Sequence, residues 1–330
     1  MNTPVKEQVR KFYETIGWRQ IGEGLYQNAR YEDLRPVSRE YLRRCHLRVS
    51  SHLPVEGKYL LDAGSGPIQY PEYLQYSEGF DYRVCLDISR LGLTEARARL
   101  GVRGLYVVGD VAHLPFVSGA FEGLVSLHTV HHLPPEEHRL AFGEFMRSLR
   151  AEGRGVVVYS WGRRSGLMRI ARPLITSANL LRRFYAKLRR KNEQRFTATR
   201  SLREGLNPAR ISQRNSQQYP AMISAQGGNT GASELLDPAV PLLSQPGTFT
   251  FKHDYRWFRQ ALADFSGMEI LVWRAVSTQF LRALIHHRLY GEKVLKVLQM
   301  LEERLPHFLG RHGQYPMIVF RKPSLRRSDR

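Results

Sequence analysis

Hydrophobic and polar positions follow two different patterns along the chain. Between residues 58 and 161, short apolar runs alternate with longer stretches that have helical spacing. The apolar runs are Tyr59–Ala63, Arg83–Ile88, Gly104–Gly109, Phe121–Leu127 and Gly155–Trp161. Segments such as Leu91–Leu100 and Glu136–Leu149 lie between them and have the helical spacing. Strands that alternate with helices indicate βαβ units around a parallel sheet.

The flanking segments predict what surrounds this sheet. Helices are expected at Pro4–Ile16, Pro36–Leu53, Gly166–Arg190, Tyr255–Phe265 and Leu281–Leu305, and late strands at Glu269–Ser277 and Tyr315–Arg321. We therefore expect an α/β, Rossmann-like fold with a seven-stranded, mostly parallel sheet, an antiparallel edge strand pair, N-terminal helices and a helical lid or insert. The predicted regions are an N-terminal helical cap (1–55), a nucleotide-binding core (56–161), a basic helical and loop insert (162–250) and the completion of the sheet with a helical insert (251–330).

Charge is concentrated in the insert. The chain has 50 Lys and Arg against 30 Asp and Glu, a net charge of +20. Between Trp161 and Arg214 there are 15 basic and two acidic residues, a local net charge of +13. Much of this charge lies in the helical part of the insert, where Pro173 is expected to kink the helix or to begin a second one. Residues 211–248 are rich in Ser, Gln, Gly and Asn and are expected to form a loop. Three interpretations of the basic insert remain open: a lid with a solvated basic face, a helix that lies on an anionic membrane, and a nucleic-acid groove. The nucleic-acid groove has less support than the other two.

Compartment and metal content follow from what the sequence lacks. No apolar run has the roughly 18 residues of a membrane span, and the N-terminal segment does not resemble a secretory signal. Two cysteines, Cys45 and Cys85, predict neither a disulfide framework nor a metal cluster. We expect a cytoplasmic protein, with a peripheral contact at the inner membrane surface as the alternative that the basic insert leaves open.

Acidic residues and glycines stand where the first three predicted strands end. Gly64 and Gly66 follow the first strand, and glycine allows a sharp turn close to a bulky ligand. Asp87 ends the second strand, where a carboxylate can accept both hydroxyls of a ribose, and Asp110 follows the third. Each aspartate could instead cap the next helix. Their joint position is that of the ligand crevice of open α/β sheets.

The order of these residues resembles the motifs of class I S-adenosylmethionine-dependent methyltransferases, and among them the type-11 group that includes quinone-biosynthesis methyltransferases. The matching stretches are Leu61-Asp62-Ala63-Gly64-Ser65-Gly66, Asp87-Ile88-Ser89, Gly109-Asp110-Val111 and Phe121-Glu122-Gly123-Leu124-Val125. Two positions depart from the pattern: Ile68 replaces a third glycine, and Glu122 replaces an aspartate.

The resemblance implies a cofactor and its contacts. The cofactor would be S-adenosylmethionine, and residues 56–161 would form its binding core. Asp62, Gly64 and Gly66 would surround the methionine part of the cofactor. Asp87 and the adjacent Ile88 would hold the ribose. The last cofactor contact, with the adenine, would come from Asp110 and Val111.

A histidine cluster follows the fourth predicted strand, in His128-Thr129-Val130-His131-His132-Leu133-Pro134. In the family that the chain resembles, this loop faces the reactive methyl group. A neutral imidazole can take a proton from a substrate hydroxyl, so His131 is the first candidate base and His128 the second, with a rate that rises through an ordinary histidine titration. His132 is expected to serve the entry of the next helix. No metal is expected, because the cluster straddles a strand end and a turn with no further ligand fixed nearby.

Three classes of function remain in competition. The first is an O-methyltransferase that acts on a small molecule, a glycan or a lipid-linked acceptor. A nucleic-acid methyltransferase is a variant of this class, and it has less support because no Asn-Pro-Pro-Tyr-like stretch follows the fourth strand. The second is a nicotinamide dehydrogenase, which predicts a third glycine where Gln69 stands. The third is a non-catalytic methyltransferase-like protein that binds a membrane or a partner, although such a protein has no need of the carboxylates at 62, 87 and 110.

Overall fold

The computed structural model describes residues 3–22, 25–205, 247–265 and 267–324. Contacts between residues divide the chain into two compact units. The larger unit comprises residues 1–172 and 242–330, and the smaller one residues 173–241. The predicted division into four regions stays a prediction beside this observed division into two.

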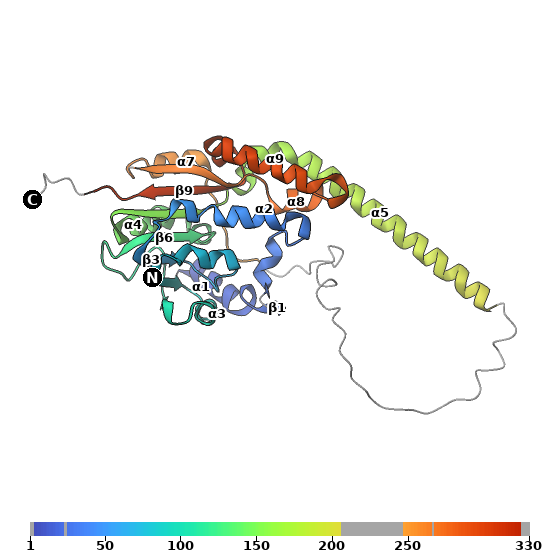
Figure 1. The fold of residues 1–330 in the computed structure, drawn as a ribbon. Helices are drawn as coiled ribbons and strands as arrows, with labels where there is room; N and C mark the ends of the chain where they lie inside the picture. The colour runs from blue at the N-terminus through green and yellow to red at the C-terminus, as the bar shows by residue number, and fades with distance from the viewer. Residues whose placement is uncertain (1–2, 23–24, 206–246, 266, 325–330) are drawn as a thin grey trace, which may run out of the picture. The chain divides into compact units, whose positions relative to one another are not determined.

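The larger unit is built around a seven-stranded sheet with the order β5-β4-β3-β6-β7-β9-β8 (Figure 1). Its strands are β3 (Gly57–Ala63), β4 (Phe80–Asp87), β5 (Gly104–Val108), β6 (Phe121–Leu127), β7 (Leu149–Val158), β8 (Met268–Arg274) and β9 (Tyr315–Arg321). The first five strands in this order pair in parallel, and β9 runs antiparallel to both of its neighbours, β7 and β8. The predicted fold class, a mostly parallel sheet with an antiparallel edge pair, is confirmed.

Strand β3 occupies the switch point of the sheet. It pairs with β4 on one side and with β6 on the other, so the chain leaves β3 in one direction and later returns to its opposite edge. Loops that follow adjacent parallel strands meet beyond their carboxyl ends, and at a switch point they diverge to opposite faces and leave room for a ligand. The loops after β3, β4 and β6 are therefore the place to look for a site.

Helices and short turns complete the larger unit. The helices are α1 (Pro4–Phe12), α2 (Pro36–Leu47), α3 (Arg90–Leu100), α4 (His138–Ser148), α7 (Tyr255–Ala261), α8 (Thr278–Leu284), α9 (Gly291–Arg304) and α10 (Pro306–His312). Thr3 caps the start of helix α1, since its side chain accepts from the Lys6 N–H, and a turn of π-helix (Tyr13–Gly17) continues the helix. A short hairpin, β1 (Gln20–Gly22) and β2 (Leu25–Tyr26), follows that turn. The predicted helical insert Leu281–Leu305 is two helices, separated at Tyr290, which has a left-handed backbone.

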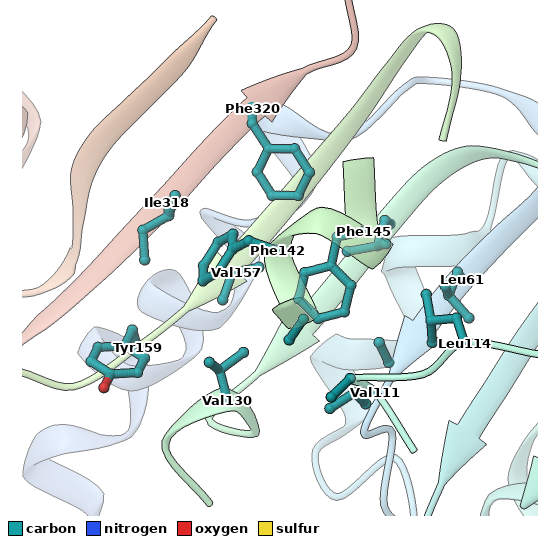
Figure 2. Packing of buried hydrophobic residues seen from close by; sticks show 14 of the residues in the cluster. Leu61, Val111, Leu114, Val130, Phe142, Phe145, Val157, Tyr159, Ile318 and Phe320 are labelled. Carbon is teal, nitrogen blue, oxygen red and sulfur yellow. The ribbon is translucent and has the colours of Figure 1, made fainter. Parts of the chain in front are cut away.

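The core between the sheet and α4 is aromatic (Figure 2). The ring of Phe142 lies 5.8 Å from that of Phe145 on the same helix and 6.3 Å from that of Phe320 on β9. Tyr159, just past β7, packs against Phe258 of α7 with ring centroids 4.8 Å apart. The late strand and α7 therefore share one core with the early βα units, as expected for a single sheet.

Helix α5 (Gly166–Gly205) begins in the larger unit and continues into the smaller one, with Pro173 inside it. The predicted helix over Gly166–Arg190 is therefore present, and it continues beyond the predicted end. Most of the predicted loop, residues 211–248, lies outside the described residues. Among the described helices, none combines the length and apolarity that a membrane span needs.

Candidate cofactor and acceptor site

A strained turn carries the chain out of β3. Gly64 and Gly66 have φ values of 79° and 51°, in the left-handed region that side chains disfavour. A Cβ on Gly64 would lie 2.3 Å from the Thr129 side chain, and one on Gly66 would lie 2.6 Å from Trp18. The Gly64 N–H donates to the Leu86 carbonyl over 2.7 Å, which ties the turn to β4. Both predicted glycines are therefore required by the backbone and by its close neighbours.

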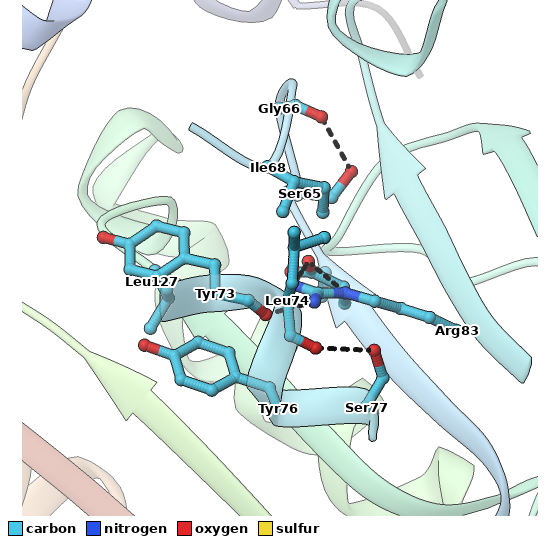
Figure 3. A network of polar contacts seen from close by, with 12 residues as sticks. Ser65, Gly66, Ile68, Tyr73, Leu74, Tyr76, Ser77, Arg83 and Leu127 are labelled. Carbon is cyan, nitrogen blue, oxygen red and sulfur yellow. Dashed lines mark hydrogen bonds and ion pairs between the residues drawn. The ribbon is translucent and has the colours of Figure 1, made fainter. Parts of the chain in front are cut away.

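Asp62 is held by a buried arginine, Arg83. Figure 3 shows Arg83 reaching toward the segment that carries Tyr73. Arg83 Nε and Nη2 both donate to Asp62 Oδ2, over 3.0 and 2.5 Å, while Nη1 donates to the Tyr73 carbonyl. Because both partners of this ion pair are buried, the loss of either would leave an uncompensated charge in the interior. The contact predicted between Asp62 and the methionine part of the cofactor stays a prediction, and the pair with Arg83 fixes where that carboxylate stands.

Asp87 joins the glycine turn to the start of α3. Its Oδ2 accepts from the Gly66 N–H and its Oδ1 from the Ser89 N–H, each over 2.8 Å. Burial raises the pKa of this carboxyl to about 6, against the opposing effect of the two N–H groups. Each carboxylate oxygen has a second lone pair, so Asp87 can still accept from two ribose hydroxyls. Ile88, the next residue, is half-buried.

Asp110 contacts a lysine that the sequence analysis did not single out. Lys6 Nζ lies 2.5 Å from Asp110 Oδ2 and 2.5 Å from Glu137 Oε2. Burial opposes the charge of Lys6, but the two carboxylates outweigh it and raise its pKa. Asp110 Oδ1 accepts from the Ala112 N–H, and Val111 is buried beside it. Helix α1 is thereby attached to the loop after β5.

Two aromatic residues of the N-terminal segment also reach this side of the sheet. Tyr13 and Trp18 stack with ring centroids 4.8 Å apart, and the Tyr13 hydroxyl lies 2.9 Å from His132 Nε2. Trp18 packs on Gly66 and on Gly92 of α3, and its buried Nε1 has no hydrogen-bond partner within the described parts of the chain. Sequence reasoning missed Lys6, Tyr13 and Trp18, since their only signal was the amphipathic spacing of a covering helix.

The three histidines after β6 have three different environments. His132 is fully engaged: Nδ1 donates to the Phe249 carbonyl over 2.8 Å, and Nε2 accepts from Tyr13. Burial lowers its pKa to about 4. We interpret His132 as a residue that anchors this loop, in keeping with its expected place at the helix entry.

His128 is held in an unusual backbone conformation. Its φ is 56°, which is uncommon for a residue with a side chain, and its N–H donates to the Val158 carbonyl over 2.9 Å. The ring meets those of Trp273 and Tyr315 at centroid distances of 5.0 and 5.6 Å. Burial lowers its pKa to about 3. Backbone strain of this kind persists where the surroundings over-determine it, which is common at functional sites.

His131 is a buried histidine with an uncommitted nitrogen, a property that it shares with His46, His138 and His253, which lie outside this loop. Its Nδ1 has no hydrogen-bond partner in the described ranges, and its ring lies 6.4 Å from that of His128. Burial lowers its pKa well below the ordinary histidine value. The expectation that the candidate base titrates like an ordinary histidine is therefore wrong, because a buried imidazole resists protonation.

A returning segment covers the histidine loop. The Phe251 N–H donates to the His131 carbonyl over 2.9 Å, and the neighbouring Lys252 is half-buried. A Cβ on Gly162 would lie 2.8 Å from Lys252 Cδ, which places this side chain just beyond the carboxyl end of β7. No ion pair joins Lys252 to an acid in the described segments, and burial lowers its pKa. Lys252 was also missed, since a single lysine after a long loop has no distinguishing pattern.

A buried ion pair closes the far side of the histidine loop. Arg274 pairs with Glu32, and both contact the Thr278 hydroxyl. The Arg274 guanidinium also lies 4.5 Å from the ring centre of Tyr315, which in turn contacts His128. Glu32 offsets the charge of Arg274, so Lys252 remains the cation near the histidines that lacks an acidic partner among the residues described.

Comparisons with known proteins agree with the motif positions. Residues 61–157 match the model of the family described as "Methyltransferase domain". A relative from Encephalitozoon cuniculi, named "Putative methyltransferase", is 38% identical over 84 residues, 26% of this chain and 36% of its own length. The match thus spans about a third of that relative.

Several solved structures are similar at a greater distance. Geranyl diphosphate C-methyltransferase from Streptomyces coelicolor aligns over 97% of this chain and 98% of its own, at 14% identity and a TM-score of 0.48. The YcgJ protein from Bacillus subtilis aligns over 37% of this chain and 51% of its own, at 21% identity and a TM-score of 0.32. Neither similarity informs on the acceptor. The family match, together with the sheet order, identifies residues 61–157 as part of a class I S-adenosylmethionine-dependent methyltransferase domain.

Proposed function

We propose that this chain is an S-adenosylmethionine-dependent methyltransferase that methylates a hydroxyl group of a small molecule, a glycan or a lipid-linked acceptor. One observation carries the proposal: the glycine turn after β3, Asp87 at the end of β4 and the histidine loop after β6 meet at the switch point of the sheet. Asp87 bonds to Gly66 in that turn, and Thr129 of the histidine loop packs on Gly64.

The residues present fit the cofactor. The backbone of Gly64 and Gly66, with Asp62 behind it, would lie along the methionine part. Asp87 and Ile88 would hold the ribose, and Asp110 and Val111 the adenine. The uncommitted lone pairs of Asp87 and the unpartnered Trp18 Nε1 support this fit, since buried polar atoms in native proteins normally have partners. When bound, the cofactor supplies a sulfonium methyl group.

His131 would act as the general base for the acceptor hydroxyl. Its unpartnered Nδ1 is free to accept a proton, and its lowered pKa keeps the ring neutral at physiological pH. In this role the nitrogen would accept the proton that the acceptor hydroxyl gives up. His128 remains the second candidate base, because its backbone is strained and its own ring lies 6.4 Å from that of His131. No step in this scheme requires a metal.

The acceptor and the location belong to the same proposal. The loop that would face the methyl group contains neutral histidines, and the segment that covers this loop adds one cation, Lys252. These groups suit a polar acceptor. A nucleic-acid acceptor and a non-catalytic binding protein are the alternatives that experiment must separate. We place the protein in the cytoplasm, with lipid-linked acceptors reached at the inner membrane surface.

Two measurements test this function. Calorimetry with S-adenosylhomocysteine should show one binding site per chain, and no binding would leave a non-catalytic protein as the better reading. Radiolabelled S-adenosylmethionine should then transfer label to a component of a metabolite and lipid extract. Label that appears only in added DNA or RNA would replace the hydroxyl acceptor by a nucleic-acid one.

A further inference from the structure

The part of α5 that lies in the smaller unit has an exposed apolar stripe. Leu174, Leu181 and Leu188 recur at intervals of seven residues, and Phe184 and Tyr185 lie between them. Residues spaced in this way share one face of a helix. Each of the five is more than a third exposed, from 41% at Leu188 to 66% at Tyr185. A stripe of large apolar side chains exposed together marks an interaction surface.

The remaining faces of the same helix are basic. From Pro173 to Arg190 there are five Lys and Arg and no acidic residue. At 100° per residue, Arg183, Lys187 and Arg190 fall on the side opposite the stripe, and Arg182 falls at its border. Figure 1 shows α5 as one continuous helix, so the apolar and basic residues belong to the same element.

We propose that residues 174–190 of α5 dock on an anionic lipid surface, with the apolar stripe in the boundary of the acyl chains and the basic residues among the headgroups. A helix with leucine and aromatic residues on one face and a high density of cations on the other is the arrangement that binds in this way. Charge complementarity selects anionic lipids, because this segment has five basic residues and no acidic one. The inference goes beyond methyl transfer and does not depend on it.

Two other occupants fit the stripe less well. A nucleic acid would engage the basic face through phosphates and would leave five large apolar side chains in water. A second copy of this helix would cover the stripe, but would bring two unbroken runs of positive charge close together. A lipid surface satisfies both faces at once.

Cosedimentation of the full chain with lipid vesicles tests the proposal. The vesicles contain phosphatidylcholine alone or with about a third phosphatidylglycerol, at low and high salt. The first variant changes Arg182, Arg183, Lys187 and Arg190 to Gln. The second changes Leu181, Phe184 and Leu188 to Ser. The matched control changes four exposed basic residues of the larger unit to Gln: Arg39, Arg97, Arg154 and Arg259.

Binding to the anionic vesicles should exceed binding to the neutral ones, and high salt should weaken it. The first variant should lose about 100-fold or more in partition, the second variant should also lose binding, and the control should change by less than tenfold. An equal loss in the control, or equal binding to both kinds of vesicle, would overturn the proposal.

Two parallel measurements separate the alternatives. If sedimentation shows a dimer that the apolar variant converts to a monomer while no vesicles are bound, the stripe pairs with a second copy and the proposal fails. If a DNA duplex binds and vesicles do not, the basic face serves nucleic acid and the proposal likewise fails. Calorimetry with S-adenosylhomocysteine is expected to give the same affinity in all variants, so a defect of the methyltransferase site would be recognised separately.

Discussion

The cofactor side and the acceptor side of the sheet draw their residues from different distances along the chain. The cofactor contacts proposed here, from Asp62 to Val111, come from three consecutive strand ends. The acceptor side combines the histidine loop with Glu32 and with Lys252 and Arg274, which follow Glu32 by more than two hundred residues. The difference explains why the cofactor side could be recognised from motifs, whereas only the histidine loop of the acceptor side could.

The two sides also differ in electrostatics. On the cofactor side, carboxylates accept from backbone N–H groups or pair with Lys6 and Arg83. On the acceptor side, burial keeps the histidines neutral. A side that binds through fixed charges should respond to mutation in affinity. Mutations on the side that moves a proton should instead change the turnover rate. Measuring affinity and turnover for variants of both sides tests this contrast.

The largest effect is expected at His131. His131→Ala should lower turnover by about 10²- to 10⁴-fold, the usual contribution of a general base, with near-normal affinity for S-adenosylhomocysteine. Single-turnover kinetics with the acceptor found in the extract screen would measure it, with His128→Ala in parallel. If His131→Ala keeps full turnover and His128→Ala does not, the base is His128. If neither variant loses turnover, the acceptor needs no base, and an amine or carbanion becomes the better choice.

Asp87 should show the opposite signature. Asp87→Ala should weaken S-adenosylhomocysteine binding by about 10- to 100-fold, since a hydrogen bond to a charged group is worth about 1.5–3 kcal/mol. Asp81→Ala is the matched control, because Asp81 lies on the same strand and is exposed. Calorimetry gives both affinities. Equal affinity in the parent and in Asp87→Ala would remove the ribose contact from the proposal.

The pH dependence of binding should sharpen the same contrast. Burial raises the pKa of Asp87 to about 6, above its ordinary value, so the free protein binds a proton at this site below pH 6. The ribose hydroxyls need the ionised carboxylate, and affinity for S-adenosylhomocysteine should therefore fall about tenfold between pH 7 and pH 5. The histidines should leave turnover at saturating cofactor nearly flat over that range, because burial lowers the pKa values of both His128 and His131 and favours their neutral forms. Affinity in Asp87→Ala should be independent of pH; a parallel fall in this variant would assign the titration elsewhere.

The smallest effect is expected at His132, in stability. His132→Ala removes two hydrogen bonds and should reduce the free energy of unfolding by about 1–3 kcal/mol, while Tyr13→Phe removes one and should cost about 1 kcal/mol. Urea unfolding would measure both. A large loss of turnover in His132→Ala without a loss of stability would contradict its role as an anchor.

Local patterns predicted the sheet better than its edges. Strands β6 and β9 have the predicted bounds, whereas β7 begins at Leu149 rather than near Gly155. Its first half is polar and exposed at Arg150 and Glu152, so no apolar run marks it. Trp18 and Arg274 could not be predicted for a related reason: their importance comes from packing against Gly66 and Glu32, which no spacing in the sequence encodes.

The position of β9 has a consequence for synthesis on the ribosome. Strand β9 is the last of the sheet to be translated, yet it lies between β7 and β8. Until residues 315–321 emerge, β8 has no strand to pair with, and the apolar edge Val156–Val158 of β7 stays open. An open edge of this kind is a template for pairing between chains. A nascent chain stalled before residue 315 is therefore expected to need a chaperone, whereas the same chain released in full closes its own sheet.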